Sequence, residues 1–145
     1  MKTGKNKNKG FTLSELLFVF LIVMVTSVFL FPVIRYTRLR LKQTICANNL
    51  REIGLALYIY AKEHEGKFPP DIKTLYKEQY LSDIKLVDCP GSKIVGLPEN
   101  PDYIYTSGLS VRNESLLPLL RDATKNHFPK GKNILYVNGT VSWKE

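Results

Sequence analysis

The sequence predicts an α+β protein in which a long N-terminal helix packs on a small antiparallel β-sheet. Three observations support this class. Residues 16–34 carry no charge, apolar residues recur at helical spacing over 46–60, and residues 134–143 read as a hairpin. A chain of 145 residues has room for one small domain and an appendage.

The uncharged segment is long enough to cross a membrane. As a helix, residues 16–34 would extend about 28 Å at 1.5 Å per residue, close to the hydrocarbon core of about 30 Å. A domain this small cannot enclose such a segment, so we expect a membrane anchor. Val25, Thr26 and Ser27 make a poor signal-peptidase site, which argues against a cleaved secretory signal. Glu15 stands at its edge, where a carboxylate is costly.

Basic residues lie on both sides of this segment, so the positive-inside rule does not fix its orientation. They are Lys2, Lys5, Lys7 and Lys9 before it, and Arg35, Arg38, Arg40 and Lys42 after it. The formal net charge is +8, but four of the 21 Lys and Arg lie in the first ten residues. No basic stripe interleaved with aromatics remains, and we expect no nucleic-acid partner.

The helix should continue beyond the membrane segment and end near Gly66, because Pro69 and Pro70 follow. Its apolar stripe should be the seam against the chain's own globular domain. A residue as small as Gly54 would permit close packing. The stripe consists of Cys46, Leu50, Ile53, Leu57 and Tyr60.

The remaining chain is read as short elements joined by loops. Asp71 suits the N-cap of a helix to about Gln79. Residues 86–91 suit a short strand or extended piece, 91–102 a loop, 103–106 a strand and 113–123 a short helix. Asn138-Gly139 predicts a type I′ turn in the terminal hairpin.

The first residues resemble a known processing signal. Basic residues, then Gly10, then Phe11-Thr12-Leu13-Ser14-Glu15 and an apolar run resemble the class III leader of type IV pilins and type II secretion pseudopilins. The resemblance implies that a prepilin peptidase cuts after Gly10 and methylates the new amine of Phe11. It implies that Glu15 and Pro32 serve subunit assembly.

Several roles stay open for Glu15. In a filament, its carboxylate would pair with the Phe11 amine of a neighbouring subunit. A pair within one subunit, a place at the headgroup level, or stabilisation of a helix N-terminus are the alternatives. Pro32 should kink or loosen its helix.

The resemblance also implies an organisation and a location. Residues 1–10 would be the leader, 11–34 the transmembrane and filament-core helix, 35–66 its amphipathic continuation and 67–145 the globular domain. The protein would cross the bacterial inner membrane once, with the N-terminus cytoplasmic and the C-terminal domain periplasmic or extracellular. Its partners would be the prepilin peptidase, other pilin or pseudopilin subunits, the assembly platform and the membrane.

A second resemblance covers part of the later chain. Residues 46–57, Tyr60-Ala61, 66–70 and Cys89-Pro90 look like a bacterial group of short pilin-like proteins. Many of these end in His, nine residues, then Asp-Gly. Here ten residues separate His127 from Asn138-Gly139, so the chain departs from that pattern.

No catalytic motif is evident. Cys46 and Cys89 form a candidate disulfide, with two separate cysteines as the alternative, and their spacing is not that of metal ligands. His64 and His127 should be surface residues. Asp83, Asp88 and Asp102 are read as solvated acids rather than calcium ligands of the kind found in some major pseudopilins. No metal or cofactor is therefore expected.

The sequence favours a structural filament subunit rather than an enzyme. The alternatives are a minor, tip-located subunit that binds a substrate or surface, and a membrane-anchored periplasmic protein that never polymerises. The sequence does not separate a pilus from a secretion system.

Overall fold

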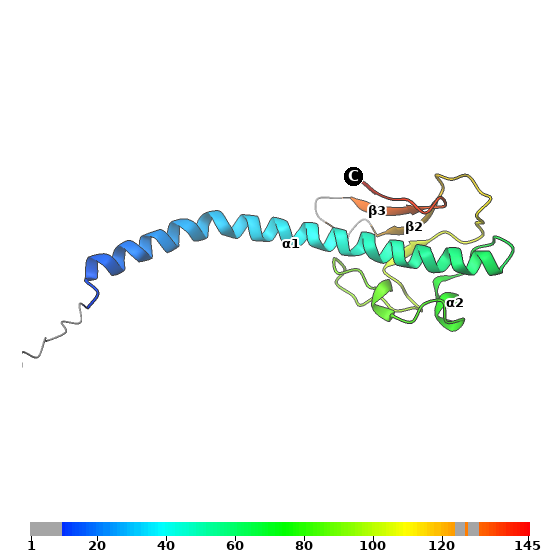
Figure 1. The fold of residues 1–145 in the computed structure, drawn as a ribbon, viewed down its shortest axis with the longest axis horizontal. Helices are drawn as coiled ribbons and strands as arrows, with labels where there is room; N and C mark the ends of the chain where they lie inside the picture. Colours follow the sequence, from blue (N-terminus) through cyan, green and yellow to red (C-terminus); the bar gives the residue numbers. More distant parts are fainter. Residues whose placement is uncertain (1–9, 124–126, 128–130) are drawn as a thin grey trace, which may run out of the picture. The chain divides into compact units, whose positions relative to one another are not determined.

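The computed structural model describes residues 10–123, 127 and 131–145. Its order is a long helix followed by short helices and a four-stranded antiparallel sheet, which confirms the predicted α+β class (Figure 1). Helix α1, Leu13–Glu63, runs through two compact units. One unit ends at Thr37 and the other comprises Arg38–Glu145.

The first unit is an apolar helix whose large side chains are exposed. An 18-residue window of α1 reaches a mean hydropathy of 2.9 and none of it is buried. Hydroxyl groups of Thr26, Ser27 and Thr37 donate to carbonyls one turn back, so these polar side chains are satisfied within the helix. Helix α1 continues through Pro32, although proline has no N–H to donate. This helix is long and apolar enough to cross a membrane.

The second half of α1 carries the predicted stripe, which is confirmed. Its five residues are all buried, four of them with no exposed surface. The helix ends at Glu63, where Gly66 takes a φ of +84° and donates its N–H to the Ala61 carbonyl at 2.7 Å. Glycine suits this left-handed closing position because it has no Cβ.

The sheet has the order β1-β2-β3-β4, with every neighbouring pair antiparallel. The strands are β1 Tyr103–Tyr105, β2 Pro118–Asp122, β3 Lys132–Tyr136 and β4 Val141–Lys144. The helix predicted over 113–123 is wrong, because β2 occupies its second half. Leu119 and Leu120 are both fully buried there, and the run of leucines lacks the alternation that marks a strand.

The terminal hairpin is confirmed but its turn is not type I′. Asn138 does not have the positive φ that a type I′ turn requires, whereas Gly139 has a φ of +81°. Gly139 N–H donates to the Tyr136 carbonyl, and Tyr136 N–H to the Thr140 carbonyl, each at 2.9 Å. This is a three-residue loop with glycine in the left-handed position. Val137 is the first residue of this loop. It is buried, and its N–H donates to the Leu117 carbonyl. The turn therefore begins one residue earlier than the predicted Asn138-Gly139 turn.

Two short helices lie in the chain segment between α1 and the first strand of the sheet. Asp71 caps α2, Ile72–Lys77, by accepting from Thr74 N–H at 2.8 Å, as predicted. The second is the 3₁₀ helix η1, Ile84–Val87. The strand reading of 86–87 is therefore wrong, because Asp83 accepts from Lys85 N–H and starts a helical turn.

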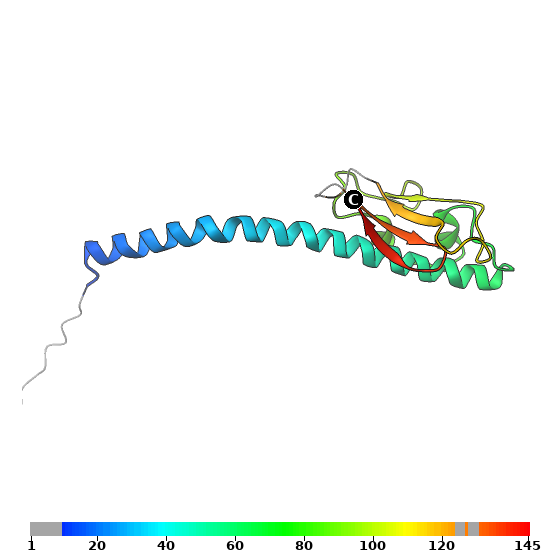
Figure 2. The ribbon, with the colours of Figure 1, turned by 90° about the horizontal axis from the view of Figure 1, so that it is seen from above.

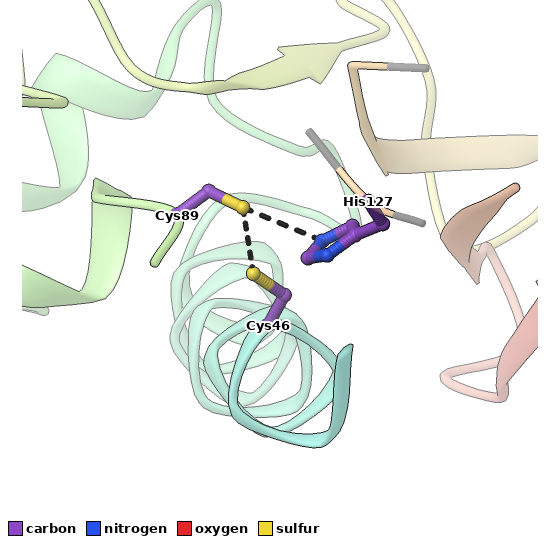
Figure 3. Close-up of side chains that lie close together, drawn as sticks. All are labelled: Cys46, Cys89 and His127. Atoms are coloured by element: carbon purple, nitrogen blue, oxygen red, sulfur yellow. Dashed lines mark hydrogen bonds between the residues drawn. The ribbon is translucent and has the colours of Figure 1, made fainter. Parts of the chain in front are cut away.

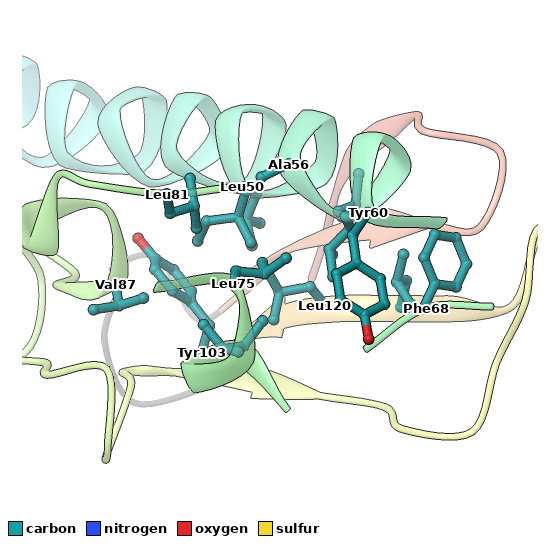
Figure 4. Packing of buried hydrophobic residues seen from close by; sticks show 14 of the residues in the cluster. Leu50, Ala56, Tyr60, Phe68, Leu75, Leu81, Val87, Tyr103 and Leu120 are labelled. Carbon is teal, nitrogen blue, oxygen red and sulfur yellow. The ribbon is translucent and has the colours of Figure 1, made fainter. Parts of the chain in front are cut away.

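One hydrophobic core joins these elements (Figure 4). Leu50 and Tyr60 of α1, Leu75 of α2, Val87 of η1 and Leu120 of β2 all belong to it. Figures 1 and 2 show α2 and the strands alongside the C-terminal half of α1. A Cβ on Gly54 would lie 3.0 Å from Leu135 Cδ2, so glycine does allow β3 to approach the helix closely.

Candidate functional site

The residues of the predicted processing site lie at the start of α1. Gly10 and Phe11 are exposed and precede the helix, and Phe11 keeps 86% of its surface. A Cβ built on Gly10 would meet nothing within 4 Å. Both residues of the predicted junction are therefore accessible in the part of the chain that the structure describes.

Glu15 closes the first turn of α1 in a capping box. Its Oε2 accepts from both the N–H and the hydroxyl of Thr12, each at 2.9 Å, and the Thr12 hydroxyl lies 3.4 Å from Glu15 N. This reciprocal pairing satisfies N–H groups that a helix start leaves open. The alternative in which Glu15 stabilises the N-terminus of the helix thus matches hydrogen bonds that this residue makes. Thr followed three residues later by Glu was the sequence signal for it.

A second, unexpected group of polar side chains lies inside the globular unit (Figure 3). Cys46 comes from α1, Cys89 from the segment after η1, and His127 from the segment after β2. Their ligand atoms all lie within 4.8 Å of one another. The two Sγ atoms are 2.8 Å apart, and Cys89 Sγ is 3.4 Å from His127 Nε2. All three residues are buried.

Asp122 of β2 adds a carboxylate to this group, and Asn133 fixes its position by hydrogen bonds. Its Oδ2 lies 3.2 Å from His127 Nε2 and accepts from both Asn133 N–H, at 2.9 Å, and Asn133 Nδ2, at 2.8 Å. Asn133 Nδ2 also donates to the Gln43 carbonyl of α1. Asp122 has no exposed surface, and its Oδ1 has no hydrogen-bond partner among the described residues. We call Cys46, Cys89, His127 and Asp122 the buried cluster.

The cluster separates the two thiols electrostatically. The hydrogen bond with Cys46 and that with His127 lower the pKa of Cys89, although burial opposes the shift. The same contact with Cys89, together with burial, raises the pKa of Cys46. Burial alone would lower the pKa of His127, but hydrogen bonds with Asp122 and Cys89 raise it to about 9. These contacts therefore favour the thiolate on Cys89 over one on Cys46, and the protonated form of His127.

This arrangement is not that of a cysteine hydrolase. A catalytic triad uses one imidazole nitrogen for the nucleophile and the other for the acid. Here Cys89 and Asp122 both face the same nitrogen, Nε2 of His127. Cys89 is also buried, with 1% of its surface exposed.

The sequence expectations for these residues met different outcomes. His127 was expected at the surface, which is wrong, because Asp122 and Cys89 bind it inside the unit. His64 is half-buried and stacks on Tyr60. Cys46 and Cys89 meet as thiols in contact, and the disulfide between them stays a prediction.

The three acids considered for calcium serve local structure instead. Asp83 caps η1, Asp88 accepts from Gly96 N–H, and Asp102 accepts from Cys89 N–H and the Ser92 hydroxyl.

Sequence reasoning missed the role of Asp122, Asn133 and His127. Cys46 and Cys89 are 43 residues apart, and Cys89 and His127 are 38 apart, so no local spacing links them. Only the folding of β2 and β3 against α1 brings these residues together.

Comparison with known proteins identifies one region. The family model described as the prokaryotic N-terminal methylation motif matches residues 5–31. No curated protein and no solved structure gives a significant match to the chain. The matched residues include the Gly10–Phe11 junction, Glu15 and most of the exposed apolar helix. The N-terminal segment of this chain is therefore similar to a prepilin leader of class III, which is followed by the apolar helix.

Proposed function

We propose that the mature chain is a structural subunit of a filament of the type IV pilus or type II secretion class. The methylation motif at residues 5–31 supports processing as a prepilin, and the resemblance to pilins and pseudopilins supports a structural role for the processed chain. The observation that carries the proposal is the continuity of the motif with an apolar helix that no other part of the described chain covers. Such a helix needs either lipid or the helices of other subunits around it.

Processing would create the positive charge that could pair with the Glu15 carboxylate, namely the amine of Phe11. Cleavage between Gly10 and Phe11 removes the leader with its four lysines and leaves a cationic, methylated amine on Phe11. A carboxylate that enters an apolar surrounding is tolerated when an opposite charge pairs with it. We infer that Glu15 pairs with the Phe11 amine of a neighbouring subunit. Before assembly, the contact with Thr12 holds the carboxylate at the first turn of α1.

The membrane stage follows from the same segment. The subunit would wait in the inner membrane with its leader in the cytoplasm and the unit Arg38–Glu145 on the far side. An assembly platform would then draw it into the fibre, where the apolar helices pack together. Pro32 leaves one helical hydrogen bond unmade, and this would let the helix adjust as it leaves the lipid.

The test combines the mature N-terminus with variants of Glu15. Mass spectrometry of the wild-type protein should find a chain that begins with methylated Phe11. Glu15→Ala and Glu15→Gln should both insert into the membrane, yet yield at least about tenfold fewer subunits in sheared fibres, because one unpaired charge costs well over 1.4 kcal/mol. Glutamine can still serve a capping box, so this variant separates capping from charge.

Thr12→Ala is the matched control. It removes the hydroxyl that contacts Glu15 but keeps the carboxylate, and we expect it to assemble. If Glu15→Gln assembles normally and Glu15→Ala does not, Glu15 acts as a cap and the charge pair is refuted. An intact Met1, or a cut near residue 27, would refute the filament proposal as a whole.

A further inference from the structure

We propose that the buried cluster is a binding site for one divalent transition-metal ion of the zinc type. Cys46 and Cys89 would supply thiolates, His127 its Nε2 and Asp122 a carboxylate oxygen. Thiolate and imidazole are the donors that such ions select in proteins. This inference stands on the interior of the globular unit and does not depend on filament assembly.

The two Sγ atoms and His127 Nε2 all lie within 4.8 Å of one another. With ordinary zinc–ligand bonds, a tetrahedral site places sulfur and nitrogen about 3.5 Å apart, and Cys89 Sγ lies 3.4 Å from His127 Nε2. The Asp122 carboxylate lies beside the same nitrogen, with its Oδ2 at 3.2 Å. Two thiolates on zinc lie about 3.8 Å apart, so the sulfur atoms, now at 2.8 Å, would separate by about 1 Å.

The carboxylate is the second argument for an ion. Asp122 is fully buried, and its Oδ1 has no hydrogen-bond partner among the described residues. An unsatisfied buried acceptor is costly, and a metal ion satisfies it. Asn133 holds the other oxygen with two hydrogen bonds and reaches the Gln43 carbonyl. Such outer contacts orient the ligands of metal sites.

A disulfide between Cys46 and Cys89 is the competing state. It would bond the same two sulfur atoms, but it would involve neither the imidazole of His127 nor the buried carboxylate of Asp122. A metal ion uses all four side chains and offsets negative charge that burial otherwise makes costly. The cluster as a whole, and not the two cysteines alone, therefore favours the ion.

An ion here would join four parts of the chain. Its ligands come from α1, from the segment after η1, from β2 and from the segment that follows β2. An ion held by such separate parts contributes its binding energy to folding, because the unfolded chain offers no formed site. Zinc should raise the thermal unfolding midpoint of the wild-type globular unit, and a chelator should lower it.

The test uses the full chain in detergent, reduced and loaded with zinc, then freed of excess metal. Elemental analysis should find one zinc ion per chain, and cobalt in place of zinc should give a thiolate charge-transfer absorption band. Cys89→Ser and His127→Gln should each lower zinc affinity at least about tenfold, as should Asp122→Asn. His64→Gln is the matched control, since His64 lies outside the cluster, and it should bind zinc like the wild type.

Two results would overturn the proposal. One is a reduced wild-type chain that binds no zinc and whose unfolding midpoint does not respond to zinc or chelator, a measurement that needs no variant. The other is zinc binding that survives His127→Gln unchanged. Alkylation of free thiols at the moment of cell lysis would show whether Cys46 and Cys89 are free or bonded in protein taken from the membrane. Two free cysteines support the site, and a Cys46–Cys89 bond in place of metal refutes it.

Discussion

At the scale of single residues, two glycines mark close approaches of the backbone with opposite tolerance. A Cβ on Gly96 would lie 2.2 Å from the Val87 carbonyl oxygen and 2.9 Å from Asp88 Cα, which are backbone atoms of the segment beside it. A Cβ on Gly54 would meet only methyl groups of Leu135, at 3.0 and 3.2 Å. Methyl groups can rotate away, whereas a backbone must shift as a whole.

Gly96→Ala should therefore lower the free energy of unfolding by about 1–3 kcal/mol, the range for overpacking a close contact. Gly54→Ala is the comparison. Alanine favours a helix over glycine by about 1 kcal/mol, which offsets the strain against Leu135. Urea unfolding in detergent, followed by the fluorescence of Trp143, measures both variants. An equal loss of unfolding free energy in the two variants would show that the backbone contact at Gly96 does not make this position less tolerant than Gly54.

At the scale of elements, caps decide where the short helices start. Helix α2 has six residues, too few to be stable by itself, so its N-cap and its buried Ile72 and Leu75 carry it. Asp71 accepts from both the N–H and the hydroxyl of Thr74, each at 2.8 Å. These hydrogen bonds lower the pKa of the Asp71 carboxyl.

Asp71→Ala should cost about 0.5–2 kcal/mol of unfolding free energy, and Asp71→Ser should restore most of it. The wild-type contribution should also depend on pH. Because the folded-state pKa is lowered, the contribution is fully present above the ordinary carboxyl pKa and is lost as pH falls through the lowered one. Urea titrations of wild type and Asp71→Ala at neutral and strongly acidic pH should converge in acid. A constant gap between them would exclude the charged cap.

The sequence predicted elements best where one pattern repeats over several turns. The stripe from Cys46 to Tyr60 is periodic, and every member is buried as expected. Strand β2 was missed because its leucines run together without alternation, and its pairing with β1 and β3 decides its state. The contact of His127 with Cys89 has no sequence signature, because it forms only after α1, β2 and β3 pack.

At the scale of the whole molecule, burial divides the chain. Large apolar side chains from Leu13 to Ile34 are exposed, whereas those on the inner stripe of the later helix lie in the core. The same helix thus serves two different surroundings. Within the globular unit it supplies Leu50, Ile53 and Leu57, each with no exposed surface. The four-stranded sheet is small, and its buried face packs in the same core as these helix residues.

Leu50→Ala should therefore lower the free energy of unfolding of the globular unit by about 2–5 kcal/mol. Leu55 lies on the same helix but keeps 64% of its surface, so Leu55→Ala should change it by less than about 0.5 kcal/mol. Urea unfolding of the detergent-solubilised chain distinguishes them. Similar effects of both substitutions would mean that the stripe is not the support of the sheet.

The outer strands of the sheet have a consequence for chains crowded side by side. Strands β1 and β4 each have one neighbouring strand in the described sheet, so each has an outer edge that could pair with another chain. Both edges are short, with three and four residues, and β4 ends in Lys144. Short and charged edges discourage edge-to-edge strand addition. In the proposed filament, copies gathered at high density would thus resist amyloid-like growth of the sheet through these edges.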